Sequence, residues 1–182
     1  IPGAGNYTLY ISGTQLIKEG TYYFYCVSKS GMASSTLSIT LDKTKPVGAL
    51  YGGAYNVANG GYTNAEYIRF LATDLTQMTA YVKLPKKTSY VEYNMGAKFT
   101  DEGAYSFYAR DAASNVSDIY TITLDRNIPT AGLYVDDESV ENHSYTNGGH
   151  IRFECAEKCY VKLPGSSSFT DYLSGAEYYR PG

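Results

Sequence analysis

Hydrophobic and polar residues alternate with a period of two along several short stretches of this chain, and no stretch carries an apolar stripe with helical spacing. Alternation of this kind is typical of antiparallel strands that bury one face. The residues expected to face inward are Ile68, Phe70 and Ala72; Tyr105, Phe107 and Ala109; and Tyr120, Ile122 and Leu124. The pattern therefore predicts an all-β protein.

Turn-forming residues divide the central part of the chain into short segments. Clusters rich in Gly, Pro, Asn, Asp and Ser occupy positions 59–61, 85–89 and 111–115, and such clusters separate strands. The predicted strands cover residues 45–52, 62–72, 78–84, 89–99, 103–110 and 116–125. Short strands with regular turn signals suit an immunoglobulin-like β-sandwich.

The sequence also repeats itself with a period of 83 residues. Matching segments are Thr40-Leu41-Asp42 with Thr123-Leu124-Asp125, Tyr62-Thr63-Asn64 with Tyr145-Thr146-Asn147, and Ile68-Arg69-Phe70 with Ile151-Arg152-Phe153. Beyond Phe153 the shift falls to 79, because a connection between two expected strands is four residues shorter there. Such a period is too long for a solenoid unit and fits a small all-β domain.

The repeat divides the chain into three parts. Residues 1–42 match the C-terminal half of a repeat, residues 43–125 form a complete repeat, and residues 126–182 match the N-terminal part of a third. We therefore expect tandem immunoglobulin-like domains in an elongated arrangement, taken from a longer polypeptide. Pro46 and Pro129 follow the two boundaries, and because proline fixes φ it favours restrained, end-to-end connections.

Two segments carry a family resemblance. The stretch EGAYSFYARDAASNVS, residues 102–117, and the boundary LDKTKP, residues 41–46, resemble the last strands and the interdomain linker of bacterial Ig-like repeats. Tyr22 and Tyr105 fall where the tyrosine corner of such sandwiches lies. Phe24 and Phe107 replace the second cysteine of antibody domains, and Trp is absent, which excludes antibody-type domains. The resemblance implies an extracellular protein, secreted or at the cell surface.

Composition and charge narrow the class of partner. The formal net charge is −3, and without a basic stripe to neutralise phosphates we expect no nucleic acid binding. No apolar run approaches the length of a membrane span. Tyr accounts for 21 of the 182 residues, and its apolar ring and polar hydroxyl suit both sandwich cores and binding surfaces.

The chain has three cysteines. Cys155 and Cys159 flank a three-residue connection between two expected strands, so a disulfide is reasonable if their Cα atoms come within about 7 Å. A redox or metal pair is the alternative, although two thiolates supply only half the ligands of a structural zinc. A disulfide favours an oxidising, extracellular compartment. Cys26 is expected to be a buried core thiol, or else to bond a cysteine outside this chain.

The sequence contains no recognisable catalytic motif. A phosphate-binding loop, a nucleophile elbow and a helical His-Glu pair are all missing, so we predict that the protein is not an enzyme. His143 and His150 are the only histidines. Both fall near an expected turn, and we expect them to be exposed to solvent.

Carboxylates near the repeat boundaries are the candidate metal ligands. Asp42 and Asp125 precede the boundary prolines, and Asp111 lies in an expected turn. Ca²⁺ needs six or more converging oxygen ligands, which the domain junctions of some arrays that this chain resembles supply. Alternatively, these residues are turn formers that bond their own backbone. We therefore expect no cofactor, with calcium as the candidate exception.

Three functions fit these features. The leading hypothesis is a non-enzymatic spacer or adhesive segment of a large bacterial surface or secreted protein. The alternatives are an accessory module of a secreted carbohydrate-active enzyme and a module that itself binds a host glycan or protein. For direct binding, the candidate exposed aromatic residues are Tyr55, Tyr90 and Tyr93. Other copies of the same array are a further candidate partner.

Overall fold

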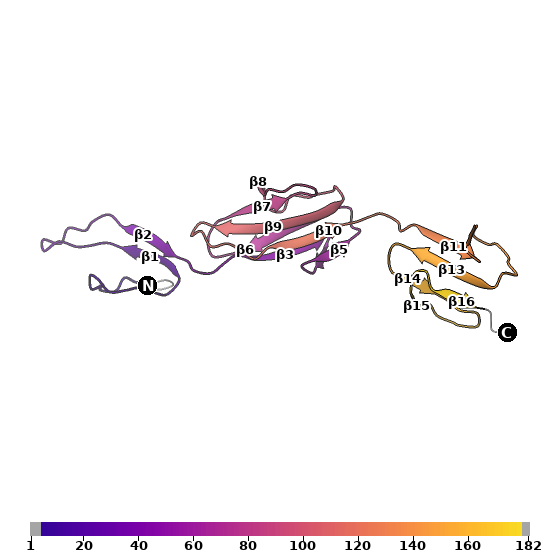
Figure 1. Cartoon of the computed structure of the whole chain (residues 1–182). Helices are drawn as coiled ribbons and strands as arrows, with labels where there is room; N and C mark the ends of the chain where they lie inside the picture. Colours follow the sequence, from indigo (N-terminus) through magenta and orange to yellow (C-terminus); the bar gives the residue numbers. More distant parts are fainter. Residues whose placement is uncertain (1–4, 180–182) are drawn as a thin grey trace. The chain divides into compact units, whose positions relative to one another are not determined.

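The computed structural model describes residues 5–179, and every regular element in that range is a β-strand (Figure 1). The prediction of an all-β protein is therefore confirmed. No helix in residues 5–179 is long and apolar enough to cross a membrane. The chain divides into two compact units, one extending to Arg126 and the other beginning at Asn127.

The first unit begins with a two-stranded antiparallel sheet. Strand β1 (Gly20–Phe24) pairs with β2 (Leu37–Leu41), and Tyr22 lies opposite Ile39. Within the described residues, β1 and β2 are hydrogen-bonded only to each other. Tyr22 is buried, and its hydroxyl donates to the backbone carbonyl of Lys18 at 2.7 Å.

The rest of the first unit is a sandwich-like pair of sheets. A three-stranded sheet has the order β4–β3–β6, and a five-stranded sheet has the order β5–β10–β9–β7–β8. Neighbouring strands are antiparallel except β5 and β10, which are parallel. The bounds are β3 Val47–Gly52, β4 Tyr55–Val57, β5 Gly61–Thr63, β6 Ile68–Thr73, β7 Met78–Lys83, β8 Val91–Tyr93, β9 Gly103–Asp111 and β10 Tyr120–Leu124.

The core of this sandwich is built from the alternating positions of both sheets. The three-stranded sheet supplies Leu50, Ile68, Phe70 and Ala72, and the five-stranded sheet supplies Val82, Tyr105, Phe107, Ala109, Ile122 and Leu124. Phe70 and Phe107 stack across the two sheets, with ring centroids 5.4 Å apart. The predicted inward faces are confirmed, with Tyr120 partly buried and the others buried.

The Tyr105 side chain repeats the geometry of Tyr22. Its hydroxyl donates to the backbone carbonyl of Asp101 at 2.8 Å, four residues upstream, as the Tyr22 hydroxyl does to Lys18. A tyrosine near the start of a strand that bonds back to the preceding backbone is the arrangement of a tyrosine corner. Each hydrogen bond thereby fixes its ring near the start of a strand, which is β1 for Tyr22 and β9 for Tyr105.

The second unit contains a four-stranded sheet in the order β12–β11–β13–β16 and a separate pair, β14 and β15. The bounds are β11 Ala131–Val135, β12 Glu138–Val140, β13 His150–Cys155, β14 Cys159–Val161, β15 Thr170–Tyr172 and β16 Glu177–Tyr179. Leu133 lies opposite Phe153, which is the register of Leu50 and Phe70 in the sandwich. The 83-residue shift therefore relates strand pairs as well as sequence.

Several predicted strand boundaries are wrong. The segment 62–72 contains two strands, β5 and β6, which belong to different sheets, because residues 64–67 carry the chain from one sheet to the other. The segment 89–99 shortens to β8, since a turn follows in which Gly96 has a φ of 83°. Strand β4 was not predicted. It forms a hairpin with β3 through a turn at Gly53.

Candidate functional site

The connection that leads into the sandwich is held by a glutamate. Glu19, the residue before β1, accepts hydrogen bonds from the N–H of Lys43 at 2.5 Å and from the hydroxyl of Thr44 at 2.9 Å. A similar bond recurs 83 positions later, where Glu102 accepts from the N–H of Arg126 at 3.1 Å. In both places the residue that follows the boundary aspartate, Lys43 or Arg126, is hydrogen-bonded to a glutamate. That glutamate immediately precedes a strand, which is β1 for Glu19 and β9 for Glu102.

The same connection is bonded to the sandwich through Asp42, which is buried. Its Oδ2 accepts a hydrogen bond from the hydroxyl of Thr76 at 2.9 Å, and its backbone carbonyl accepts from the side-chain amide of Asn115 at 3.3 Å. Its Oδ1 accepts from the N–H of Thr44 at 3.1 Å. Asp42 therefore joins the connection to two different turns of the sandwich.

Three carboxylates converge beside this connection. One oxygen from each of Asp42, Asp74 and Asp111 lies within 4.8 Å of the other two. Asp111 ends β9, is buried, and accepts from the N–H and the side-chain amide of Asn115, both at 2.8 Å. The Oδ1 of Asp74 accepts from the N–H of Leu75 at 2.5 Å. Its Oδ2 is buried and has no hydrogen-bond partner within the described part of the chain.

The two aspartates of the sandwich differ in acidity. Burial raises the pKa of Asp74, and the carboxylates of Asp42 and Asp111 raise it further, against the opposing hydrogen bond from Leu75. Burial also acts to raise the pKa of Asp111, but the hydrogen bonds from Asn115 outweigh it, so the pKa of Asp111 is lowered. Of these two residues, Asp74 is thus the one that holds a proton more readily. Carboxylate oxygens are also the ligands that Ca²⁺ prefers.

Of the predicted calcium ligands, Asp42 and Asp111 lie in this cluster, and Asp125 does not. Asp125 lies at the other boundary, where its N–H donates to the carbonyl of Thr63 at 2.9 Å. Asp74 was missed because it lies in the turn between β6 and β7, where aspartate is common as a turn former. The sequence holds no usable signal for Asp74, because only the pairing of Met78 with Asp111 in the structure places that turn beside the end of β9.

The three candidate binding tyrosines have different surroundings. Tyr55 is exposed on β4, and Tyr90 packs edge-on against Tyr108 with ring centroids 4.9 Å apart. Tyr93, on β8, is not an exposed residue. Its ring packs against that of Phe99 with the centroids 5.3 Å apart, and its hydroxyl is buried. The same burial raises the pKa of Tyr93. The prediction of an exposed Tyr93 is therefore wrong.

A different tyrosine cluster lies on the outer face of the five-stranded sheet. Tyr81 and Tyr108 are opposite each other on β7 and β9, and their rings stack with centroids 4.7 Å apart. Tyr90 packs against Tyr108, Lys83 Nζ lies 5.7 Å from the Tyr90 ring, and the Arg110 guanidinium lies 5.9 Å from the Tyr81 ring. Sequence alone does not give the β7–β9 register, so this cluster was not predicted.

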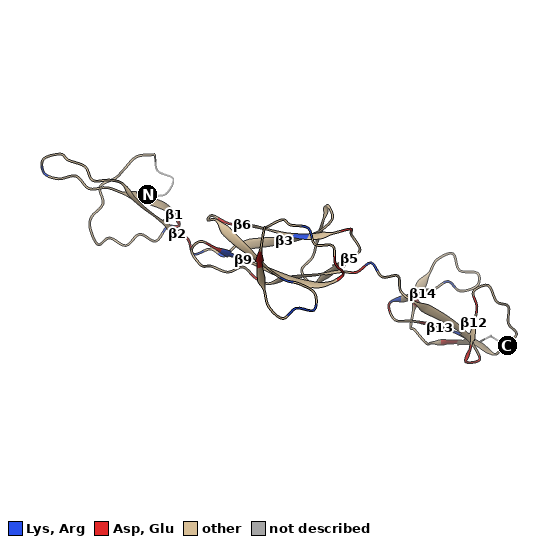
Figure 2. Ribbon diagram, turned by 90° about the horizontal axis from the view of Figure 1, so that it is seen from above, with Lys and Arg blue, Asp and Glu red and all other residues tan. Residues whose placement is uncertain are grey.

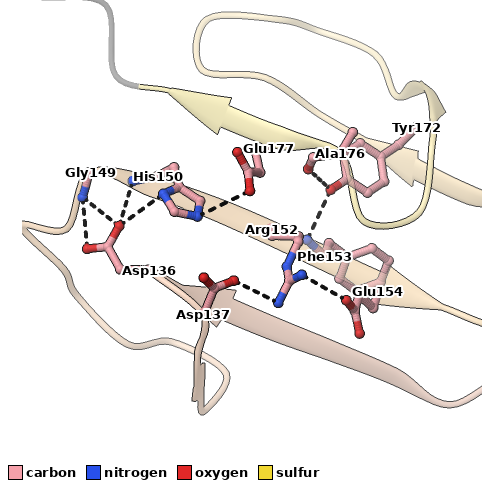
Figure 3. A network of polar contacts seen from close by, with 10 residues as sticks. All are labelled: Asp136, Asp137, Gly149, His150, Arg152, Phe153, Glu154, Tyr172, Ala176 and Glu177. Carbon is pink, nitrogen blue, oxygen red and sulfur yellow. Dashed lines mark hydrogen bonds and ion pairs between the residues drawn. The ribbon is translucent and has the colours of Figure 1, made fainter.

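His150 belongs to a polar network in the second unit (Figure 3). The carboxylate of Asp136 accepts from the N–H of Gly149 at 3.0 Å and of His150 at 3.1 Å, and it contacts His150 Nδ1 at 3.1 Å. Glu177 Oε1 lies 3.6 Å from His150 Nε2. The two backbone hydrogen bonds, helped by His150, lower the pKa of Asp136. His150 is therefore not the exposed turn residue that was predicted, because it begins β13 between two carboxylates.

The three cysteines have two different environments. Cys155 and Cys159 close the connection between β13 and β14, joined as a disulfide with their Cα atoms 6.5 Å apart, a separation that suits the predicted hairpin staple. Cys26 is exposed, with a free thiol, which contradicts the expected buried core thiol. The reason is that β1 ends at Phe24 and β1 and β2 pair only with each other in the described chain.

Charged residues of both signs are scattered over the strands and loops of residues 5–179 (Figure 2).

A scan against protein-family models finds no match for this chain. A search of curated proteins likewise finds no significant relative. Function is therefore inferred from the residues and their geometry.

Proposed function

We propose that this chain is a non-enzymatic spacer or adhesive segment of a large bacterial surface or secreted protein. The bonding of the connection between β2 and β3 carries the proposal. On one side Glu19 binds the N–H of Lys43, and on the other the buried Asp42 binds Thr76 and Asn115. A connection tied on both sides resists bending, which a spacer requires and a loose linker does not provide.

The second connection supports the same role. Besides the bond between Glu102 and the N–H of Arg126, the Arg126 guanidinium donates to the carbonyl of Thr100 at 2.7 Å and to that of Glu66 at 3.4 Å. Hydrogen bonds with a charged partner are stronger than neutral ones. These bonds hold Arg126, the last residue of the first unit, to the sandwich at the start of the second connection.

Small-angle X-ray scattering tests the spacer role through the width of the conformational distribution. We expect a narrow distribution for the wild-type chain and a broader one for Glu19→Ala and Glu102→Ala, which lose the bonds to Lys43 and Arg126. Glu92→Ala, at an exposed position of β8, is the matched control and should leave the distribution unchanged. A wild-type distribution as broad as that of a flexible linker contradicts the proposal.

The tyrosine cluster of Tyr81, Tyr90 and Tyr108 favours a second candidate, direct binding of a glycan. Aromatic rings offer an apolar surface beside a polar group, and Lys83 and Arg110 lie next to these rings. A glycan array on the intact chain tests this function, with Tyr108→Ala to remove the shared ring and the exposed Tyr55→Ala as control. Absence of binding at high protein concentration supports the pure spacer.

An accessory role in a secreted carbohydrate-active enzyme is the third candidate. The sequence flanking this chain in the full-length polypeptide separates it from the spacer role, because an accessory module is accompanied by a catalytic domain. A wall anchor or a series of further repeats in that sequence supports the spacer role instead.

A further inference from the structure

Two cations lie opposite each other on the outer face of the three-stranded sheet. Ile68 faces the core, so its neighbour Arg69 on β6 faces outward. Arg69 is paired with Tyr51 of β3, and its Cζ lies 5.0 Å from the centre of that ring. On the other side of β6, Ile68 and Phe99 form an antiparallel bridge and exchange backbone hydrogen bonds at 2.9 Å. Because antiparallel partners run in opposite directions, Lys98 lies opposite Arg69.

The second unit repeats this register around a second arginine. Arg152 is the counterpart of Arg69 at the 83-residue shift. It lies opposite Tyr134, with its Cζ 4.9 Å from the centre of that ring, and opposite Glu177 on its other side. Glu177 is the counterpart of Lys98 at the 79-residue shift. The same position beside the arginine therefore holds a lysine in the sandwich and a glutamate in the second unit.

The second unit also surrounds its arginine with carboxylates (Figure 3). The Arg152 guanidinium contacts Asp137 Oδ1 at 3.2 Å and Glu154 Oε1 at 3.3 Å. The counterparts of these acids in the sandwich are Ala54 and Leu71, which carry no charge. An arginine at this position therefore accepts carboxylates in the second unit, and the sandwich has neither of them.

The two cations of the sandwich have no carboxylate partner within residues 5–179. The ion pairs of the described residues include neither Arg69 nor Lys98. Lys98 instead lies over the ring of Tyr67, with its Nζ 4.1 Å from the centre of that ring. Like charges directly opposite each other on a sheet are destabilising. An anion bound between the two side chains removes that repulsion.

We propose that Arg69 and Lys98 together bind the carboxylates of an acidic protein segment of a partner molecule. A guanidinium presents paired N–H groups that match the two oxygens of a carboxylate. Lys98 is exposed and adds a second positive charge beside the guanidinium, so neighbouring Asp or Glu side chains of the partner engage both cations. The site uses none of the residues that hold the two connections, so it is independent of the spacer role.

The surroundings of the two cations favour a protein partner over a glycan. The rings beside them, Tyr51 and Tyr67, each contact a cation, so the face of each ring that meets the cation is not open for stacking on a sugar. The acids that contact Arg152 are the side chains of Asp137 and Glu154. Carboxylates of protein side chains therefore fit this position, and we assign the site to them.

An NMR titration of the ¹⁵N-labelled chain tests the proposal, with a capped peptide that alternates Glu and Gly as the probe. We expect amide shifts centred on β6 and on the residues around Lys98. The dissociation constant should be about 0.1–1 mM at low salt, because exposed ion pairs are individually weak. Raising NaCl to about 0.5 M should weaken binding at least about tenfold, since salt screens exposed charges. The same peptide with Gln in place of Glu should cause no shifts.

A matched pair of charge reversals locates the binding site. Lys98→Glu gives the sandwich the residue that the second unit has beside Arg152, so circular dichroism should be unchanged and binding should weaken at least about tenfold. Lys87→Glu, at an exposed position between β7 and β8, makes the same change of net charge and should bind like the wild type. Arg69→Lys keeps the charge but removes the paired N–H groups, so it should weaken binding about threefold or more.

Three results would overturn the proposal. The first is the absence of amide shifts at β6 with up to about 5 mM of the Glu peptide at low salt, a concentration at which even weak complexes form. The second is equal binding of that peptide by Lys98→Glu and the wild type. The third is tighter binding of polygalacturonate than of the peptide at equal carboxylate concentration, because the site would then belong to an acidic glycan.

Discussion

At the scale of single residues, the protonation of the Asp74 carboxyl group determines how the cluster of Asp42, Asp74 and Asp111 affects stability. Its pKa is raised by burial and by Asp42 and Asp111, so the charged form is unfavourable in the folded state. The stability that its protonated form contributes is therefore fully present below the ordinary pKa of 3.8 and is lost as the pH rises through the raised value. In metal-free buffer at neutral pH, we therefore expect the charged Asp74 carboxylate to lower the stability of the fold.

We therefore expect Asp74→Asn to stabilise the metal-free chain at neutral pH by less than about 1 kcal/mol, because the amide donates to Asp111 and removes a charge that solvent partly screens. The gain should shrink as the pH falls and Asp74 takes up a proton, because its pKa is raised. Urea unfolding across this pH range measures it, with the exposed Glu92→Gln as control. A gain that is independent of pH would show that the charge of Asp74 is not its cause.

Calcium should act through the same oxygens. Asp42, Asp74 and Asp111 converge within 4.8 Å, and no N–H group or hydroxyl of the described residues donates to the buried Asp74 Oδ2. We expect about 1–10 mM Ca²⁺ to raise the thermal midpoint of the wild type and to leave that of Asp74→Asn unchanged. Asp125→Asn, at the other connection, should keep the response. Equal midpoints for the wild type with Ca²⁺ and with EDTA would rule out this site.

The contribution of the tyrosine corner to stability can be tested by removing a single oxygen atom, the hydroxyl of Tyr105. In Tyr105→Phe the carbonyl of Asp101 loses the hydroxyl that donates to it at 2.8 Å. The loss should cost about 1 kcal/mol of unfolding free energy. Tyr108→Phe, on the outer face of the same strand, is the matched control and should cost less. Equal costs in denaturant unfolding would show that the Tyr105 bond has no special role.

At the scale of elements, alternation in the sequence predicted which side chains face inward but not where strands end. Ile68 and Phe70 are buried as expected, since period-two alternation is a local property of a strand. The split of residues 62–72 was not predictable, because Thr63 pairs with Leu124 while Ile68 pairs with Gly52. Sheet membership depends on partners far away in sequence, which local preference does not encode.

The same difference holds for the candidate site: some of its residues are predictable from local sequence features, and others only from the pairing of distant strands. Asp42 and Asp111 were identified from their places at a boundary and a turn, which are sequence features. Asp74 joins them only through the pairing of β7 with β9, and Tyr81 meets Tyr108 through that pairing as well. Cys26 was expected to be buried because its counterpart Ala109 is on an inward face, but burial requires a facing sheet, which residues 5–42 do not form.

The disulfide gives a prediction at this scale. In the native chain without reductant, alkylation should label Cys26 alone, because Cys155 and Cys159 are joined. Reduction should lower the stability of the second unit by less than about 3 kcal/mol, since the closed loop is very short. Mass spectrometry and thermal melts with and without reductant measure the two effects. Labelling of Cys155 and Cys159 in the folded, unreduced chain would contradict the disulfide.

At the scale of the whole molecule, the spacer proposal depends on whether the connections from β2 to β3 and from β10 to β11 are rigid. The first connection is bonded through Glu19 on one side and through Asp42 on the other. A flexible linker would instead leave these backbone groups to water. The amides of Lys43 and Thr44 lie between the two sets of bonds, so their motion reports directly on the connection.

The decisive measurement is ¹⁵N relaxation of the intact chain at the amides of Lys43 and Thr44. We predict order parameters of about 0.85 for both, equal to those of the β9 amides, because side-chain carboxylates accept from both N–H groups. Order parameters below about 0.6 at these two amides, with rigid values in β9, would show a flexible linker and contradict the spacer role.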